Sequence, residues 1–126
     1  MFVGYNRFVE VTNIPRNKRV RHEADEEVDL KVKDTILRFD VDSDEEDNYD
    51  INLPGAYDAM GLMYFIYVRD TGSNGDADCA VTVKDAEGST VKTFSTVGDT
   101  PGQAHWVLLL SVGEMWIELA DGDVSP

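Results

Sequence analysis

The sequence is poor in the residues that cross-link small secreted proteins or bind metals. It contains one cysteine, two histidines and four prolines among 126 residues. A single cysteine, Cys79, excludes an intrachain disulfide, so burial or assembly must hold the fold together. The sequence shows neither the long apolar run of a membrane span nor the basic-then-apolar start of a signal peptide. We therefore expect synthesis in a reducing cytoplasm and no membrane partner.

Positive charge is scarce in most of the chain. There are 11 Lys and Arg residues against 25 Asp and Glu residues, a net charge of −14. Residues 1–38 are nearly balanced at +1, whereas residues 39–126 carry −15. Nucleic acids and anionic membranes attract positive charge, so we expect no nucleic-acid partner. The uneven distribution predicts two surfaces with different neighbours.

The apolar pattern predicts one all-β domain, a compact antiparallel sandwich or barrel with an extended N-terminal arm. From residue 28 onward, short apolar segments recur every 8–12 residues with turn signals between them, as in sandwiches and barrels. We assign residues 28–120 to this domain, residues 1–27 to an N-terminal arm or docking segment, and residues 121–126 to a polar C-terminal tail.

Two segments predict the centre of the fold. Residues 104–119 read AHWVLLLSVGEMWIEL, a pattern typical of a β-hairpin with Gly113 at a positive φ in its turn. Residues 106–110 are apolar on both faces, which predicts a central strand that is buried on both sides. Residues 62–68 have the same character, so the two strands either share one sheet or face each other across a sandwich.

Few residues suggest a catalytic or metal-binding site. His22 and His105 have no companion at metal-ligand spacing, and Cys79 lies on a different segment from both, so we expect no zinc site. A Cys/His pair brought together by the fold stays open at this point. No nucleophile, phosphate-binding or metalloprotease motif occurs. We expect no enzyme activity, no cofactor and no metal.

Residues 40–50 are rich in acids and are predicted to form a loop. Asp40, Asp42 and Asp44 have the spacing that opens an EF-hand calcium loop. However, Glu45 stands where the loop requires glycine, and Ile51 stands where it requires a bidentate glutamate. We reject the EF-hand; an irregular calcium site and a plain solvated loop both stay open.

The N-terminal segment combines apolar and basic residues. Its apolar part is either an ordinary first strand or an arm that packs on a neighbouring subunit, with the candidate interface residues Phe2, Tyr5 and Phe8. Its basic part precedes a run of acids and is either a solvated linker or a docking segment for an acidic surface. The candidate docking residues are Arg16, Lys18, Arg19 and Arg21.

The remaining aromatic residues have two interpretations. They would line a carbohydrate groove if they were exposed, or pack in the core or a subunit interface if they were buried. Because most of them lie in apolar segments, we expect packing. The residues are Tyr49, Tyr57, Tyr64, Tyr67, Trp106 and Trp116.

Residues 36–119 resemble small β-domains of tailed-bacteriophage structural proteins. In those domains a strand ending in Leu-Pro leads to a glycine and a further strand, and the domain closes on a Ser-Asp-Gly-x-x-Trp hairpin. The matching parts here are Ile51–Pro54, Gly61, Tyr64–Val68, the valine-rich 81–83 and Leu108–Trp116. One departure is Val112, where those domains usually have a polar turn residue.

The resemblance implies a virion structural protein without catalytic residues. The expected function is a head decoration (cement) protein on the outer surface of the head, which bridges capsid subunits as a homotrimer. The basic cluster at residues 16–21 would contact the major capsid protein. The alternative is a tail-fibre or spike module that binds host-surface carbohydrate or a receptor, although the chain lacks the repeats or coiled-coil stalk usual in a fibre.

Overall fold

The computed structural model describes residues 17–21 (backbone only), 27–42, 44, 48–72, 79–95, 97 and 100–125. Within these residues the chain forms nine strands in two sheets. The five-stranded sheet has the order β1 (Asn17–Arg21), β3 (Ile36–Val41), β5 (Met63–Asp70), β8 (Ala104–Ser111) and β9 (Trp116–Val124). The four-stranded sheet has the order β2 (Glu27–Asp29), β4 (Asn48–Asn52), β6 (Ala80–Lys84) and β7 (Thr90–Phe94).

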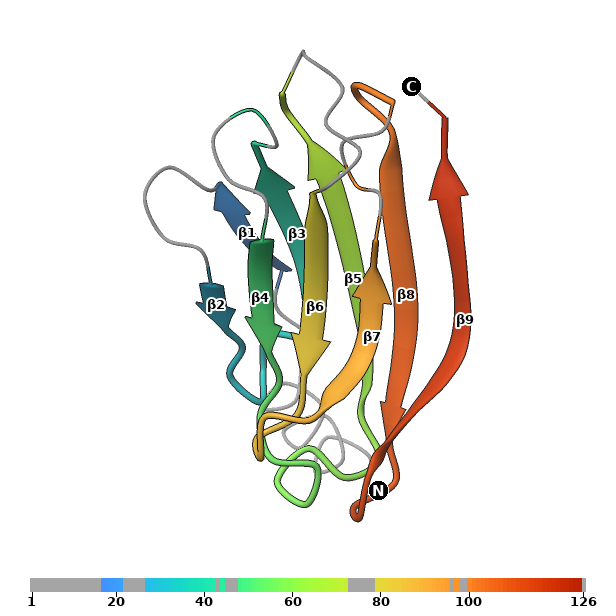
Figure 1. Cartoon of the computed structure of the whole chain (residues 1–126). Helices are drawn as coiled ribbons and strands as arrows, with labels where there is room; N and C mark the ends of the chain where they lie inside the picture. Colours follow the sequence, from blue (N-terminus) through green and yellow to red (C-terminus); the bar gives the residue numbers. More distant parts are fainter. Residues whose placement is uncertain are drawn as a thin grey trace, which may run out of the picture.

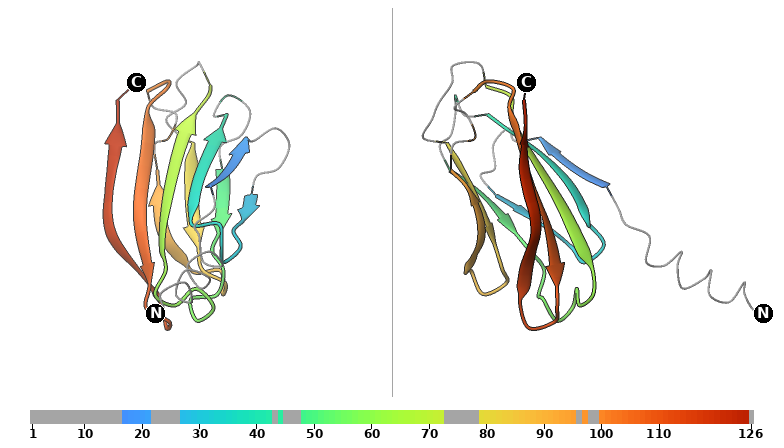
Figure 2. Two further views of the ribbon diagram at one scale, coloured as in Figure 1. Left: turned by 180° about the vertical axis from the view of Figure 1, so that it is seen from behind. Right: turned by 90° about the vertical axis from the view of Figure 1, so that its right-hand side faces the viewer.

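The two sheets pack face to face as a sandwich, so the prediction of an all-β fold is confirmed (Figures 1 and 2). The inward side chains of both sheets form one apolar core, as alternation along each strand requires. Its largest fully buried members are Tyr49, Tyr64, Phe39, Leu37, Ile51, Ile66 and Leu109. Cys79 lies in the same core.

The strand pairing is mixed, not antiparallel as predicted. From β1 to β6 the chain alternates between the two sheets, placing odd-numbered strands in one and even-numbered strands in the other. Each crossing reverses the chain, so strands two apart run the same way and pair in parallel: β1 with β3, β3 with β5, β2 with β4, and β4 with β6. The pairs β5–β8, β6–β7 and β8–β9 are antiparallel.

The predicted hairpin is β8–β9, and its two-residue turn places Gly113 at a φ of 95°. Strands β5 and β8 are neighbours in one sheet, with Tyr64 opposite Leu109. Both strands are interior to the sheet, but burial on both faces was a wrong prediction. Val107 and Leu109 are fully buried, whereas the intervening Trp106 and Leu108 are only partly buried.

Two strands extend the five-stranded sheet into the segments drawn on either side of residues 28–120. Strand β1 lies inside the segment 1–27 and pairs with β3. Strand β9 runs on to Val124, through the first four residues of the segment assigned to a polar tail. Residues 1–16 and 22–26 lie outside the described part of the chain. Among the residues described, no helix is long and apolar enough to cross a membrane.

Candidate docking surface

In the described part of the chain, one side of the five-stranded sheet has no second layer over it (Figure 2). We call this side the outer face. Residues that pair directly across neighbouring strands project to the same side of a sheet, so register identifies its members. They are Ile36, Arg38 and Asp40 of β3; Met63, Phe65, Tyr67 and Arg69 of β5; Ala104, Trp106, Leu108 and Leu110 of β8; and Ile117, Ala120, Gly122 and Val124 of β9.

Apolar residues dominate the outer face. One cross-strand row runs Ile36, Phe65, Leu108 and Ala120, and a second runs Met63, Leu110 and Ile117. Met63 is 56% exposed and Ile117 is 40% exposed. Single exposed apolar residues are ordinary on soluble proteins, but a contiguous set across four strands is typical of interaction surfaces.

Acidic residues are nearly excluded from this face. Of these fifteen positions only Asp40 is acidic, although 25 of the chain's 126 residues are Asp or Glu. Asp40 is itself 2% exposed and accepts a hydrogen bond from Arg38 Nε at 3.2 Å. Two of the described cations, Arg38 and Arg69, lie on the same face. The strongly acidic chain therefore presents one near-neutral to basic surface.

An aromatic platform occupies the middle of the outer face. The rings of Phe65 and Trp106 stack with centroids 5.8 Å apart, and the Arg38 guanidinium lies 5.8 Å from the centre of the Tyr67 ring. The Trp106 indole lies against the backbone of Gly122, since a Cβ there would be 2.8 Å from the ring. Trp, Tyr and Arg are the residue types enriched at binding hot spots.

The apolar surface continues at one end of the sandwich. The turn after β4 packs on the β8–β9 hairpin: Ser111 Oγ donates to Ala56 O at 2.5 Å, and Gly61 N donates to Ser111 O at 2.9 Å. This contact places Met60 against the hairpin tip, where a Cβ on Gly113 would lie 2.9 Å from the Met60 sulfur. Met60 and Met115 are 57% and 58% exposed. The flexible methionine side chain adapts to many partners.

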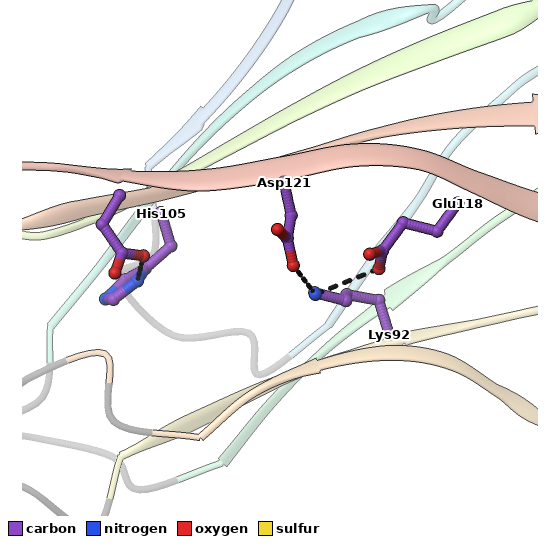
Figure 3. Close-up of polar contacts among 5 residues, drawn as sticks. Lys92, His105, Glu118 and Asp121 are labelled. Atoms are coloured by element: carbon purple, nitrogen blue, oxygen red, sulfur yellow. Dashed lines mark hydrogen bonds and ion pairs between the residues drawn. The ribbon is translucent and has the colours of Figure 1, made fainter.

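A polar cluster lies on the other side of β9, where its inward-pointing acids extend beyond the edge of the smaller sheet. Lys92 of β7 contacts Glu118 Oε1 at 3.0 Å and also pairs with Asp121 (Figure 3). The hydrogen bond that Lys92 Nζ donates to Asp121, followed by the contacts with Glu118, raises the pKa of Lys92 despite its partial burial. The same contact with Lys92 lowers the pKa of the Asp121 carboxyl. These charges tie the two sheets together at their β7–β9 side.

His105 and Asp123 form the second polar contact of this cluster. His105 Nδ1 lies 2.7 Å from Asp123 Oδ1, and the imidazole ring packs 6.0 Å from the Phe94 ring. The second ring nitrogen is buried and has no hydrogen-bond partner among the described residues. A cavity of about 260 Å³ lies beside the pair, lined also by Thr93 and Ser95. The contact of His105 with Asp123 joins β8 to β9, and its contact with Phe94 joins β8 to β7, so the pair has a structural role.

The other residues singled out in the sequence divide into three groups. Tyr49, Tyr64 and Trp116 are core residues, as expected, whereas Tyr67 and Trp106 belong to the outer face and Tyr57 is 77% exposed. In the acidic loop, Asp42 Oδ1 accepts a hydrogen bond from Asp44 N at 3.0 Å. Among the residues described, no group of three or more His, Cys, Asp or Glu is placed to hold a metal.

Only some of the candidate residues of the N-terminal segment are among the residues that the structure describes. Phe2, Tyr5, Phe8, Arg16 and His22 lie outside the described residues. Lys18, Arg19 and Arg21 belong to β1, of which only the backbone is described. Reasoning on the sequence did not find the outer face, although the two-sided apolar pattern of 62–68 and 106–110 was the signal that could have found it.

Comparison with protein-family models, with curated proteins and with solved structures gave no match. The resemblance to phage structural domains therefore stays a prediction that is carried by the sequence motifs.

Proposed function

We propose that this protein is a non-enzymatic assembly protein that decorates the outer surface of a tailed-phage head as a homo-oligomer, with a trimer expected. The outer face carries the contacts between copies, and the basic cluster at residues 16–21 contacts the major capsid protein. The observation that carries the proposal is the apolar, acid-poor outer face on a chain of net charge −14.

The physical mechanism is the burial of surface. Covering apolar area releases about 25 cal/mol per Å², and a partner that binds only the assembled shell stabilises that shell by mass action. The remaining acids keep the rest of the surface soluble, so association is restricted to one face. The rigid sandwich contributes by holding the outer-face side chains in a fixed array before docking.

The first experiment measures the mass of the protein in solution. Light scattering after size exclusion should give a multiple of 14.1 kDa for the wild type. Replacing Phe65 and Leu108 by Ser should return the mass to that of one chain, because both side chains lie at the centre of the apolar rows. Replacing Thr82 and Thr93 by Ser, on the smaller sheet, is the control. A wild-type protein that stays monomeric at high concentration would contradict the proposal.

The second experiment tests capsid binding. Full-length protein should co-sediment with purified phage heads that lack it, and replacing Arg16, Lys18, Arg19 and Arg21 by Gln should abolish this binding. The control replaces Lys31 and Lys33, which are exposed on the loop after β2, by Gln. Equal binding by both variants would show that the basic cluster is not the capsid contact.

The aromatic platform favours one alternative function, a fibre or spike module that binds host-surface carbohydrate. Sugar rings stack on aromatic faces, and Phe65, Tyr67 and Trp106 form such a platform beside Arg38. A glycan array with the isolated protein separates the two proposals. Binding that disappears in Trp106→Ala would favour the carbohydrate module over the decoration protein.

A further inference from the structure

We infer that the outer face is covered by the N-terminal segment, residues 1–16, of a second copy of this chain. This inference rests on the proposed assembly function and identifies the occupant of the docking surface. Its support comes from the composition of the segment, from the point at which it joins the sheet, and from the area that an interface requires.

The composition of residues 1–16 matches that of the outer face. The segment reads MFVGYNRFVEVTNIPR and contains one acid, Glu10, against two arginines. Half of its residues are apolar, among them Phe2, Tyr5 and Phe8. In a chain in which one residue in five is acidic, the segment and the outer face thus share an apolar, acid-poor composition, and contact between them would bury apolar area.

The point of attachment places the segment beside the face. Asn17, the first residue of β1, pairs with Ile36, which pairs with Phe65, which in turn pairs with Leu108. The segment therefore joins the sheet level with the apolar row that runs from Ile36 through Phe65 to Leu108. Sixteen extended residues reach about 50 Å, which is more than twice the roughly 20 Å width of the four-stranded outer face.

The area that an interface requires favours a second copy over the segment's own sheet. The outer face is small, roughly 20 Å by 25 Å or about 500 Å² from strand geometry, whereas a standard interface covers about 800 Å² on each partner. If two copies exchange their N-terminal segments, each segment adds buried area to the interface. A segment that lay on its own sheet would cover the outer face and leave no docking surface for a second copy.

Disulfide trapping tests the position of the segment. One full-length chain carries Phe8→Cys and another carries Leu108→Cys, while the native Cys79 is fully buried and does not compete. Mixing the two under mild oxidation should give a disulfide-linked dimer of the two different chains. Pairing Phe8→Cys with Ser89→Cys, which is exposed on the β6–β7 turn of the smaller sheet, is the control and should give at least tenfold less product.

Two results would overturn the inference. Equal trapping by Leu108→Cys and Ser89→Cys would show that the segment has no preferred site. A chain carrying both Phe8→Cys and Leu108→Cys that forms only an internal disulfide, with no link in the mixture, would place the segment on its own sheet.

A mass measurement separates this inference from the proposed function. Replacing Phe2, Tyr5 and Phe8 by Ser in the full chain should reduce the assembly to a monomer, whereas replacing Asn6, Thr12 and Asn13 by Ser should not. If the wild type assembles and the aromatic variant assembles equally well, the inference fails and the assembly function stands. If the wild type is itself a monomer, the assembly function fails as well.

Discussion

Gly122 shows how a single residue positions one side chain, Trp106, of the proposed docking surface. Its φ does not lie in the left-handed region, so no backbone strain requires glycine there. The requirement is steric, because a Cβ would lie 2.8 Å from three atoms of the Trp106 indole. Glycine in a strand often marks such a close approach.

Gly122→Ala should therefore displace the indole of Trp106. We expect altered tryptophan near-ultraviolet circular dichroism, a loss of about 1–2 kcal/mol of unfolding free energy from overpacking, and weaker assembly. The control is Gly88→Ala, which has a φ of 87° and an open space around its Cβ. That variant should lose stability through strain and leave the tryptophan signal unchanged. An unchanged signal in Gly122→Ala would contradict the packing described here.

Tyr64 gives a prediction at alkaline pH. Burial, followed by the nearby Asp34 carboxylate, raises the pKa of the Tyr64 phenol from 10.0 to about 12. Below pH 10 the phenol is protonated in both states and contributes no pH dependence. Between pH 10 and 12 the unfolded chain binds fewer protons than the folded chain, so the unfolding free energy falls as the pH rises.

Urea unfolding at pH 9 and pH 11 measures this effect. From pH 9 to 11 the wild type should lose about 1 kcal/mol more than Tyr64→Phe, which lacks the ionisable group. Tyr64→Phe also removes the hydrogen bond that the hydroxyl donates to Val32 O at 2.5 Å, so its stability at pH 9 should be lower. If the wild type and Tyr64→Phe lost the same unfolding free energy between pH 9 and pH 11, the pKa of Tyr64 would not differ between the folded and unfolded states.

At the scale of the element, the features of β9 favour the outer face over the sheet edge as the proposed docking surface. It is an edge strand of nine residues, the kind of strand that invites pairing with another chain. Its register shifts between the partners Leu108 and Leu109, and Glu118, Asp121 and Asp123 point toward the smaller sheet. A bulge and inward charges both discourage strand addition.

Lys92→Met tests whether the charge cluster ties β7 to β9. We expect faster amide hydrogen exchange in β7 and β9, and little change in β3 and β5, because the ion pairs of Lys92 join the two sheets. The matched control is Lys84→Met, whose partner Asp50 lies 3.3 Å away on the neighbouring strand of the same sheet. Uniform acceleration across all strands would indicate global destabilisation and contradict a local tie.

At the scale of the whole molecule, the net charge of −14 opposes assembly. Copies that meet through the acid-poor face still repel one another through their remaining surfaces. Salt screens this repulsion, since the Debye length falls from about 14 Å at 50 mM to about 4 Å at 500 mM ionic strength.

The dissociation constant of the assembly should therefore decrease as NaCl rises from 50 to 500 mM. Sedimentation equilibrium at several salt concentrations measures it. Stronger dissociation at high salt would show that ion pairs, and not apolar contacts, dominate the interface between copies.

Much of the local structure was predictable because it depends on neighbours in the sequence. Alternation located strands from β2 onward, and Gly113 located the β8–β9 turn, whereas β1 lies in a segment interpreted as a linker or docking segment. The pairing was not predictable, because the alternation of β1 to β6 between two sheets leaves no trace in the apolar pattern of any one strand. The antiparallel expectation failed for this reason.

For the proposed docking surface, the sequence by itself determined that β5 and β8 carry apolar side chains on both faces, that acids are absent from both strands except Asp70, and that half of residues 1–16 are apolar. Only the tertiary structure decided which of the two faces lies in the core and which stays open. The reason is that the period of a strand identifies two sides, whereas the packing of a second sheet, through contacts distant in sequence, covers one of them.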